Sequence, residues 1–150
     1  MNPDPHDLQR FLSAQERDYT SALAELRAGR KKTHWIWYIL PQLAGLGTSR
    51  MASFYGIRSS TEAAAYLAHP ILGPRLVECV VTLNAHQHST AEQILGDVDA
   101  MKFRSCATLF ASVAGPDSVF QKALVQFFEG HADDRTLALL AAESGADRLT

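Results

Sequence analysis

Apolar residues recur with a helical period along most of this 150-residue chain. A spacing of three or four positions places their side chains on one face of an α-helix. At least six helices are predicted, in the stretches from Leu8 to Gly29, Ser59 to His69, Pro70 to Leu83, Ser89 to Gly96, Asp97 to Ala114, Asp117 to Glu129, and Asp133 to Gly145.

Residues 35–40 are the one stretch where strand propensity competes with helix. Aromatic and β-branched side chains favour a strand, and six residues are too few to show a period. A lone strand would leave backbone groups without ladder partners, at a cost of ~1–3 kcal/mol for each buried unsatisfied group. We therefore expect a helix there, and the fold class is predicted to be all-α, a single-domain orthogonal bundle of short helices.

The predicted helices carry their own start and stop signals. Ser59 with Glu62, and Ser89 with Glu92, have the spacing of a capping box, and Asp117 is the expected N-cap of the helix that follows it. Gly29 is expected to close the first helix, which is either bent or divided in two. The last helix is expected to bury Leu137, Leu140 and Ala141, and to end at Gly145, with residues 146–150 frayed.

Composition limits the class of protein. With 47% hydrophobic residues, the chain can bury roughly 70% of the surface that its unfolded form exposes, enough for one domain over residues 1–150. A net charge of −2 argues against binding of duplex nucleic acid, and no apolar run approaches the length of a membrane span. The acidic, proline-broken start and the two isolated cysteines, Cys79 and Cys106, favour a cytoplasmic protein with reduced, buried thiols.

Residues 29–42, with the sequence GRKKTHWIWYILPQ, resemble the signature of a bacterial family catalogued as domain of unknown function 1810. Further pieces match in order along the chain: residues 45–47, 55–57, 62–63, 66–67, 69–70, 72–73, 75–76 and 108–110, and Asp99 with Lys102 and Ser105. The resemblance implies an all-helical domain without an established activity. Some relatives are labelled calpastatin, but an inhibitor of that kind is a disordered polar chain, and this composition indicates a folded core.

Cationic residues precede large aromatic residues within the signature. Guanidinium and ammonium groups bind phosphate, and an indole stacks on a flat base, so this segment is the predicted site for a nucleotide-like or other anionic ligand. The loop at residues 45–49 and the helix expected after it would add backbone N–H donors. The predicted ligand-binding residues are Arg30, Lys31, Lys32, His34, Trp35, Trp37, Gln42, Ser49 and Arg50. The alternative is that the tryptophans pack in the core and the basic residues form a solvated face.

Two other functions remain open at this point. One is a hydrolase in which His34 acts as general acid or base, assisted by Asp99 or Glu62. Because Asp99 and Lys102 are three positions apart on a predicted helix, an ion pair with a structural role is the simpler expectation for them. The other is a protein-interaction module that exposes the aromatic block as an apolar patch. No cofactor or metal is predicted.

Overall fold

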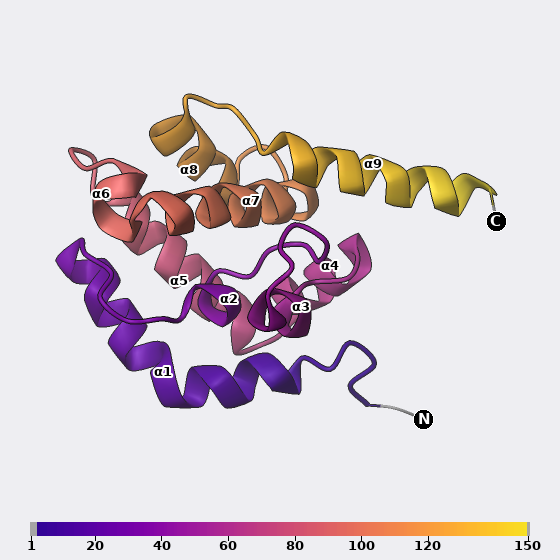
Figure 1. The fold of residues 1–150 in the computed structure, drawn as a ribbon, viewed down its shortest axis with the longest axis horizontal. Helices are drawn as coiled ribbons and strands as arrows, with labels where there is room; N and C mark the ends of the chain where they lie inside the picture. The colour runs from indigo at the N-terminus through magenta and orange to yellow at the C-terminus, as the bar shows by residue number, and fades with distance from the viewer. Residues whose placement is uncertain (1–2, 150) are drawn as a thin grey trace.

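The computed structural model describes residues 3–149, and the side chains of residues 3–144. This part of the chain forms nine helices and no β-strand, so the all-α prediction is confirmed (Figure 1). The helices are α1 (Gln9–Ala28), α2 (Ile36–Ile39), α3 (Arg50–Tyr55), α4 (Ser60–Ala68), α5 (Leu72–Asn84), α6 (Ala91–Leu95), α7 (Asp97–Ala114), α8 (Val119–Phe128) and α9 (Asp134–Leu149).

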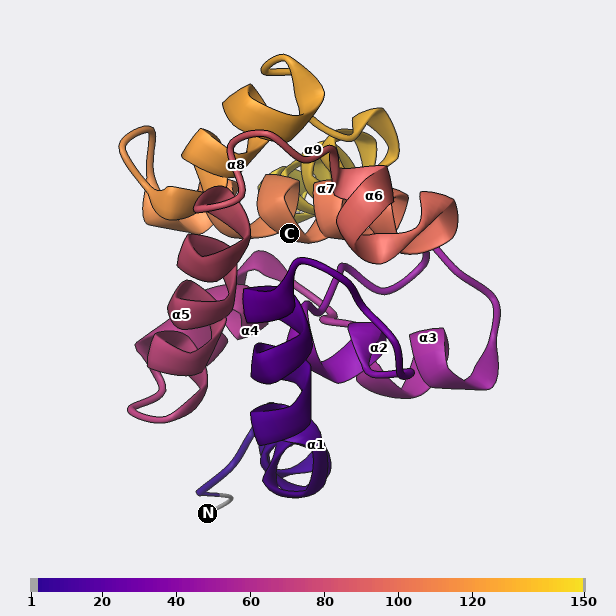
Figure 2. The ribbon, with the colours of Figure 1, turned by 90° about the vertical axis from the view of Figure 1, so that its left-hand side faces the viewer.

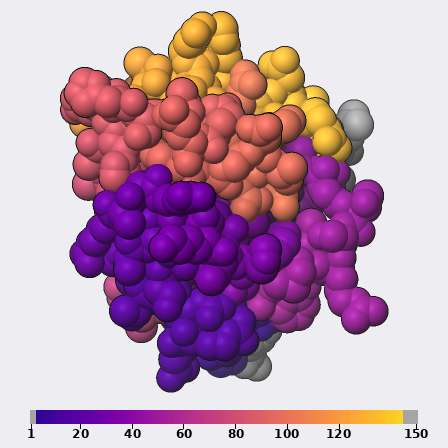
Figure 3. All heavy atoms as spheres, turned by 60° about the vertical axis from the view of Figure 1, so that its left-hand side comes forward, coloured from indigo at the N-terminus to yellow at the C-terminus, as the bar shows by residue number. Residues whose placement is uncertain are grey.

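The helices form two layers within one domain. Helices α1 to α4 make the first layer and α6 to α9 the second, while α5 packs against α1 and α4 on one side and α8 on the other (Figures 1 and 2). Figure 3 shows the two layers meeting across the middle of one face, the first in indigo to magenta and the second in orange to yellow. Much of the line of contact is formed by residues that follow α1.

The central helix is α7, as its apolar circumference predicts. Its middle, from Ser105 to Phe110, is buried, and Phe110 contacts aromatic rings on two other helices, Tyr66 of α4 and Phe120 of α8. The first half differs from the prediction, because Val98 and Met101 are 67% and 70% exposed. These two side chains lie where α7 extends past α4 and α8 toward the loop after α2, and so apolar surface faces solvent there.

The ambiguous block at residues 35–40 is helical, with α2 as a single short turn. Extended structure appears only after it, as an isolated parallel bridge between Leu43 and Ile57. The Ala44 N–H donates to the Ile57 carbonyl at 2.7 Å, and the Ile57 N–H donates to the Gln42 carbonyl at 3.0 Å. This bridge fixes the backbone on both sides of α3.

Several helix ends are where the sequence places them. Gly29 takes the left-handed conformation, with φ of 76°, and closes α1, which is one bent helix in both ribbon views. Ser49 caps α3 by accepting a hydrogen bond from the Ala52 N–H, and Ser59 caps α4 by accepting one from the Glu62 N–H at 3.0 Å. Glu62 does not complete the capping box, because its carboxylate accepts from the Arg58 N–H and pairs with another residue.

Four other predictions of local structure are wrong. The capping box of α6 is formed by Thr90 and Gln93, one residue later than Ser89 and Glu92, because only that register satisfies both reciprocal bonds. Ser118, not Asp117, caps α8. The backbone of α9 continues through Gly145 to Leu149, since one glycine inside a helix costs only about 1 kcal/mol, and Thr150 lies outside the described residues. Leu137 and Ala141 are exposed, because α9 projects beyond the helices beneath it (Figure 1).

A buried ion pair ties α1 to α4. Arg10 Nη2 lies 2.7 Å from Glu62 Oε2, and both side chains are 2% exposed. The same guanidinium donates to the backbone carbonyls of His6, Asp7, Phe54 and Gly56. Every donor of Arg10 that faces the interior therefore has a partner, and the loop before α4 is held against α1.

We expect Arg10→Met to lower the free energy of unfolding by about 3–5 kcal/mol, because it leaves the Glu62 carboxylate buried without a counter-charge. Urea denaturation followed by circular dichroism measures the loss. Arg27→Met, at an exposed arginine of the same helix, is the matched control and should change stability by less than about 0.5 kcal/mol. Equal losses in the two variants would contradict a stabilising role for the pair.

Candidate functional site

The backbone of the basic segment already holds an anion, the carboxylate of Glu25. Its Oε1 accepts hydrogen bonds from the N–H groups of Lys32 at 2.6 Å and Thr33 at 2.9 Å, and from Trp35 Nε1 at 3.0 Å. The Thr33 hydroxyl donates to Oε2 at 2.6 Å. Partial burial acts to raise the pKa of Glu25, but the four hydrogen bonds outweigh this effect and lower the pKa to about 2. The segment therefore binds a carboxylate of its own chain, through backbone N–H groups, a hydroxyl and an indole N–H and not through the side chains of Arg30, Lys31 or Lys32.

The two tryptophans are in different environments. Trp35 is 1% exposed, and its ring packs in the core beneath Lys31, whose ammonium lies 5.0 Å from the ring centroid. Trp37 is half-buried, and the Lys102 ammonium lies 5.1 Å from its ring. Trp37 Nε1 has no hydrogen-bond partner among the described residues. The structure therefore does not bring the two indoles to one cavity, and the aromatic block is not an exposed apolar patch.

The three predicted cations also separate. Arg30 and Lys32 are exposed, as is His34. Lys31 is drawn inward, with its side chain 8% exposed and its ammonium 2.9 Å from Asp99 Oδ2 on α7. Its backbone N–H donates to the Ile94 carbonyl at 2.7 Å. Lys31 thus joins the signature segment to α6 and α7, and Arg30 and Lys32 do not share its surroundings.

The predicted contribution of a helix N-terminus at Ser49 and Arg50 is small in this structure. The Ser49 hydroxyl already accepts from the Ala52 N–H at 3.1 Å, and Arg50 is exposed. The helix α3 has only six residues. The N-terminus of α3 is therefore already capped by its own chain.

The residues proposed for hydrolysis are engaged elsewhere. Glu62 is buried against Arg10, and Asp99 is paired with Lys31 at 2.9 Å and Lys102 at 3.7 Å, which confirms the expected ion pair. His34 is exposed, and its carbonyl accepts a hydrogen bond from the Tyr38 hydroxyl. The three side chains form no acid–base arrangement around a common space.

The two cysteines are buried thiols. Burial raises the pKa of Cys79 to about 12 and also raises that of Cys106. A thiol with so little thiolate at neutral pH is a poor nucleophile. Core packing accounts for both residues.

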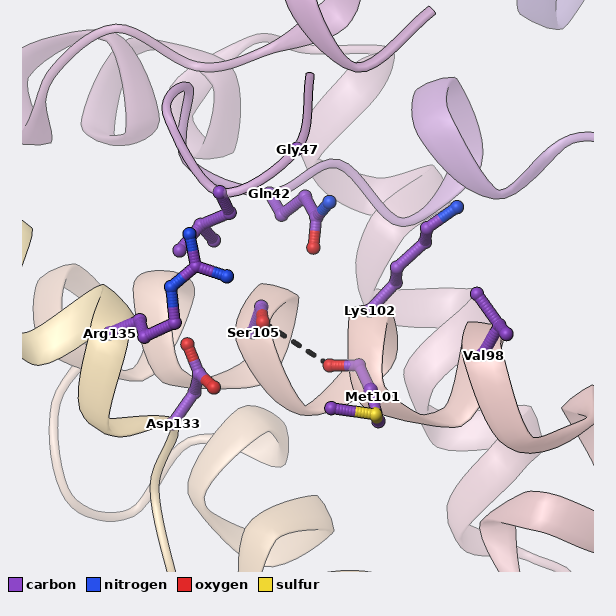
Figure 4. A pocket seen from close by; sticks show the side chains of 9 residues that line it. Gln42, Gly47, Val98, Met101, Lys102, Ser105, Asp133 and Arg135 are labelled. Carbon is purple, nitrogen blue, oxygen red and sulfur yellow. Dashed lines mark hydrogen bonds between the residues drawn. The ribbon is translucent and has the colours of Figure 1, made fainter. Parts of the chain in front are cut away.

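A hollow on α7 gathers polar and charged groups from three parts of the chain. Its volume is about 230 Å³, and we call it the α7 hollow. The loop after α2, the first half of α7 and the start of α9 line it with Gln42, Leu46, Gly47, Val98, Met101, Lys102, Ser105, Asp133 and Arg135. Figure 4 shows the Gln42 amide between the Lys102 ammonium and the Arg135 guanidinium.

The charges of the α7 hollow are unevenly balanced. Asp99 serves both Lys31 and Lys102, and its contact with Lys102 is the longer one, at 3.7 Å against 2.9 Å. The Asp133 carboxylate accepts bonds from the N–H and hydroxyl of Thr136, as the N-cap of α9. Arg135 is exposed. Two cations therefore face the hollow, while the nearby carboxylates are shared or engaged in capping.

Sequence reasoning reached only part of this site. Gln42 was predicted to bind ligand, and Asp99 and Lys102 were expected to pair on one helix. Ser105 donates back to the Met101 carbonyl at 3.2 Å, as its position one turn further along the helix predicts. Arg135 was missed, since nothing in the sequence indicates that α9 starts beside this face of α7. The signal in the sequence that pointed to this face of α7 was the spacing of Asp99, Lys102 and Ser105, three residues apart on a predicted helix.

The comparisons with known proteins give a family and a fold. The family described as protein of unknown function, DUF1810, matches over residues 5–140. The chain belongs to this family. The conserved hypothetical protein Rv1873 from Mycobacterium tuberculosis, known from a crystal structure, is 48% identical, with a TM-score of 0.90 over 92% of this chain and 99% of that one. None of the curated proteins compared matches the chain.

The family resemblance and the α7 hollow share residues. All of the residues that line the hollow, from Gln42 to Arg135, fall within residues 5–140, the part of the chain that matches the DUF1810 family. Trp37 and Asp99, which contact Lys102, lie within this part as well. No helix in the described part of the chain has the length and apolarity to cross a membrane.

We expect Glu25→Gln to lower the free energy of unfolding at neutral pH by about 1–2 kcal/mol, a value below full linkage because the side chain is partly exposed. The folded pKa of about 2 lies below the ordinary 4.5, so the stabilisation is complete above pH 4.5 and is lost as the pH falls toward 2. Thermal unfolding across this range should therefore show the variant and the parent converging in acid. Glu16→Gln, at an exposed position of α1, should show no such convergence.

Proposed function

We propose that this domain binds a small anionic ligand in the α7 hollow. The observation that carries the proposal is the position of Lys102. Its side chain lines the hollow, and the carboxylate with which it pairs, Asp99, is shared with Lys31. Arg135 supplies a second cation from α9. The Gln42 amide adds a hydrogen-bond donor between the two cations (Figure 4), while the Ser105 hydroxyl lines the hollow with its proton donated to the Met101 carbonyl.

Electrostatics supports an anion over a cation or a neutral polar ligand. Lys31, Lys102 and Asp99 together carry one excess positive charge, and the carboxylate of Asp133 is directed to the start of α9. A hydrogen bond from a charged donor to a carboxylate or phosphate is about twice as strong as a hydrogen bond between neutral groups. The Trp37 face beneath Lys102 limits where its ammonium can lie, which reduces the entropy lost when a ligand binds.

The α7 hollow replaces the basic segment as the location of binding. Glu25 occupies the N–H groups of Lys32 and Thr33 and the Trp35 indole, so an incoming anion would have to displace a carboxylate of the chain itself. Lys102 and Arg135 face open space. Binding also accounts for the residues better than hydrolysis does, because His34 lies on the surface and Glu62 is committed to Arg10.

A cytoplasmic location stays a prediction of the sequence. The buried cysteine thiols, Cys79 and Cys106, are compatible with a reducing compartment. A ligand of such a domain would then be a soluble metabolite-sized anion.

We expect Lys102→Gln to weaken binding of inorganic phosphate or AMP by about tenfold or more, the value of a charged hydrogen bond. Amide chemical shifts of α7 and the Gln42 side-chain amide, followed by NMR during titration at millimolar concentration, measure both position and affinity. Lys122→Gln, at an exposed lysine of α8, is the matched control and should bind as the parent does.

A double variant, Arg30→Gln with Lys32→Gln, tests the original location. If it abolishes binding while Lys102→Gln does not, the ligand lies on the basic segment and the proposal for the hollow is wrong. No shift with any anion would also overturn the proposal.

A further inference from the structure

We infer that the ligand of the α7 hollow is a small organic anion with a single charged head and an apolar body, of the class of aryl or branched-chain carboxylates and organic phosphate monoesters, and not a polyphosphate or an inorganic ion. This inference rests on the proposed function and specifies its chemistry. The inference is carried by three apolar side chains that line the hollow with the two cations, Leu46, Val98 and Met101. Binding of a charged group alone would give these side chains no role.

Those side chains are exposed in a way that is unusual for the helix that carries them. Val98 and Met101 are 67% and 70% exposed on α7, although Phe103 and the run from Ser105 to Phe110 of the same helix are buried. Both line the α7 hollow together with Leu46. In Figure 4, Val98 and Met101 lie below the Lys102 ammonium, on either side of the lysine side chain. A ligand held by Lys102 therefore extends over apolar surface.

The number of cations limits the charge of the ligand. Lys102 and Arg135 face the hollow, and Asp133 lies on the Arg135 side of it (Figure 4). The two cations and the neighbouring carboxylate sum to one positive charge, which one carboxylate balances. A phosphate monoester, with a charge of about −1.5 to −2 at pH 7, exceeds that sum by one charge at most, whereas a pyrophosphate or triphosphate exceeds it further. The Gln42 amide between the cations completes a site for a single anionic head.

Size and ring contacts limit the body. A volume of about 230 Å³ is below the range of roughly 300–1,000 Å³ that holds drug-sized ligands, and suits one ring or a short branched chain. Lys102 lies over the Trp37 ring, but no aromatic side chain of the described residues lines the hollow itself, so stacking of a base does not select the ligand. The flexible thioether of Met101 makes favourable contacts with apolar and aromatic groups of varied shape.

The test compares anions that share a head and differ in body. Acetate is paired with benzoate and 3-methylbutanoate, and inorganic phosphate with phenyl phosphate, while pyrophosphate and benzyl alcohol probe excess charge and absent charge. The chain has three methionines, so methyl-labelled methionine gives three NMR signals, in which Met101 reports on the hollow and the partly buried Met51 is an internal control.

We expect benzoate and phenyl phosphate to bind at least about tenfold more tightly than acetate and inorganic phosphate, and to shift the Met101 methyl signal while Met51 stays in place. Met101→Ser should remove most of this preference, so that the affinity ratios of benzoate to acetate and of phenyl phosphate to inorganic phosphate both fall toward one. Val125→Ser, at a 59% exposed apolar position of α8, should leave both unchanged. Benzyl alcohol should not bind measurably.

The possible failures are distinct. If anions that share a head bind with equal affinity whatever their body, and Met101→Ser has no effect, the inference is overturned and anion binding is left intact. Pyrophosphate binding more tightly than phenyl phosphate would overturn it as well. If no anion binds, or if binding does not depend on Lys102, both the inference and the proposed function fail.

Discussion

The ion pair between Lys31 and Asp99 connects the two layers where the candidate site lies. Lys31 comes from the segment after α1, and Asp99 lies in the first turn of α7, so their contact at 2.9 Å fixes the signature segment against the central helix. The adjacent bond from the Lys31 N–H to the Ile94 carbonyl holds the same segment at the end of α6. Because Asp99 lies closer to Lys31 than to Lys102, its carboxylate offsets only part of the positive potential that Lys102 contributes to the hollow.

The same hydrogen-bonding chemistry is used internally at Glu25. Consecutive backbone N–H groups, a hydroxyl and an indole N–H converge on one carboxylate, an arrangement that in other settings holds a phosphate. Here it fixes the path of the chain from α1 to α2 and places Trp35 in the core. A sequence pattern shows that an anion will be bound at such a segment, and the three-dimensional fold decides whether the anion is a ligand or a side chain.

Much of the fold follows from local signals, and the site does not. Gly29, Ser49 and Ser59 end or begin helices through bonds within four residues, so the sequence specifies them directly. The partner of Lys31 is 68 positions away along the chain, and Arg135 reaches the hollow only because α9 starts beside α7. The spacing of capping residues also fails where two registers compete, as at Ser89 and Thr90, since the decision depends on backbone geometry.

The distribution of exposed apolar surface on α7 is the feature that stability does not explain. A core helix gains by burying its apolar residues, each buried large side chain being worth about 1.5–3 kcal/mol, yet Val98 and Met101 remain in solvent beside Lys102. Their neighbours Asp99 and Lys102 belong to the network of ion pairs that leads back through Lys31 to residues 29–42. A face that combines cations, an amide and uncovered apolar groups is costly to leave open. It becomes reasonable if a ligand with the same two characters, an anionic head and an apolar body, covers it.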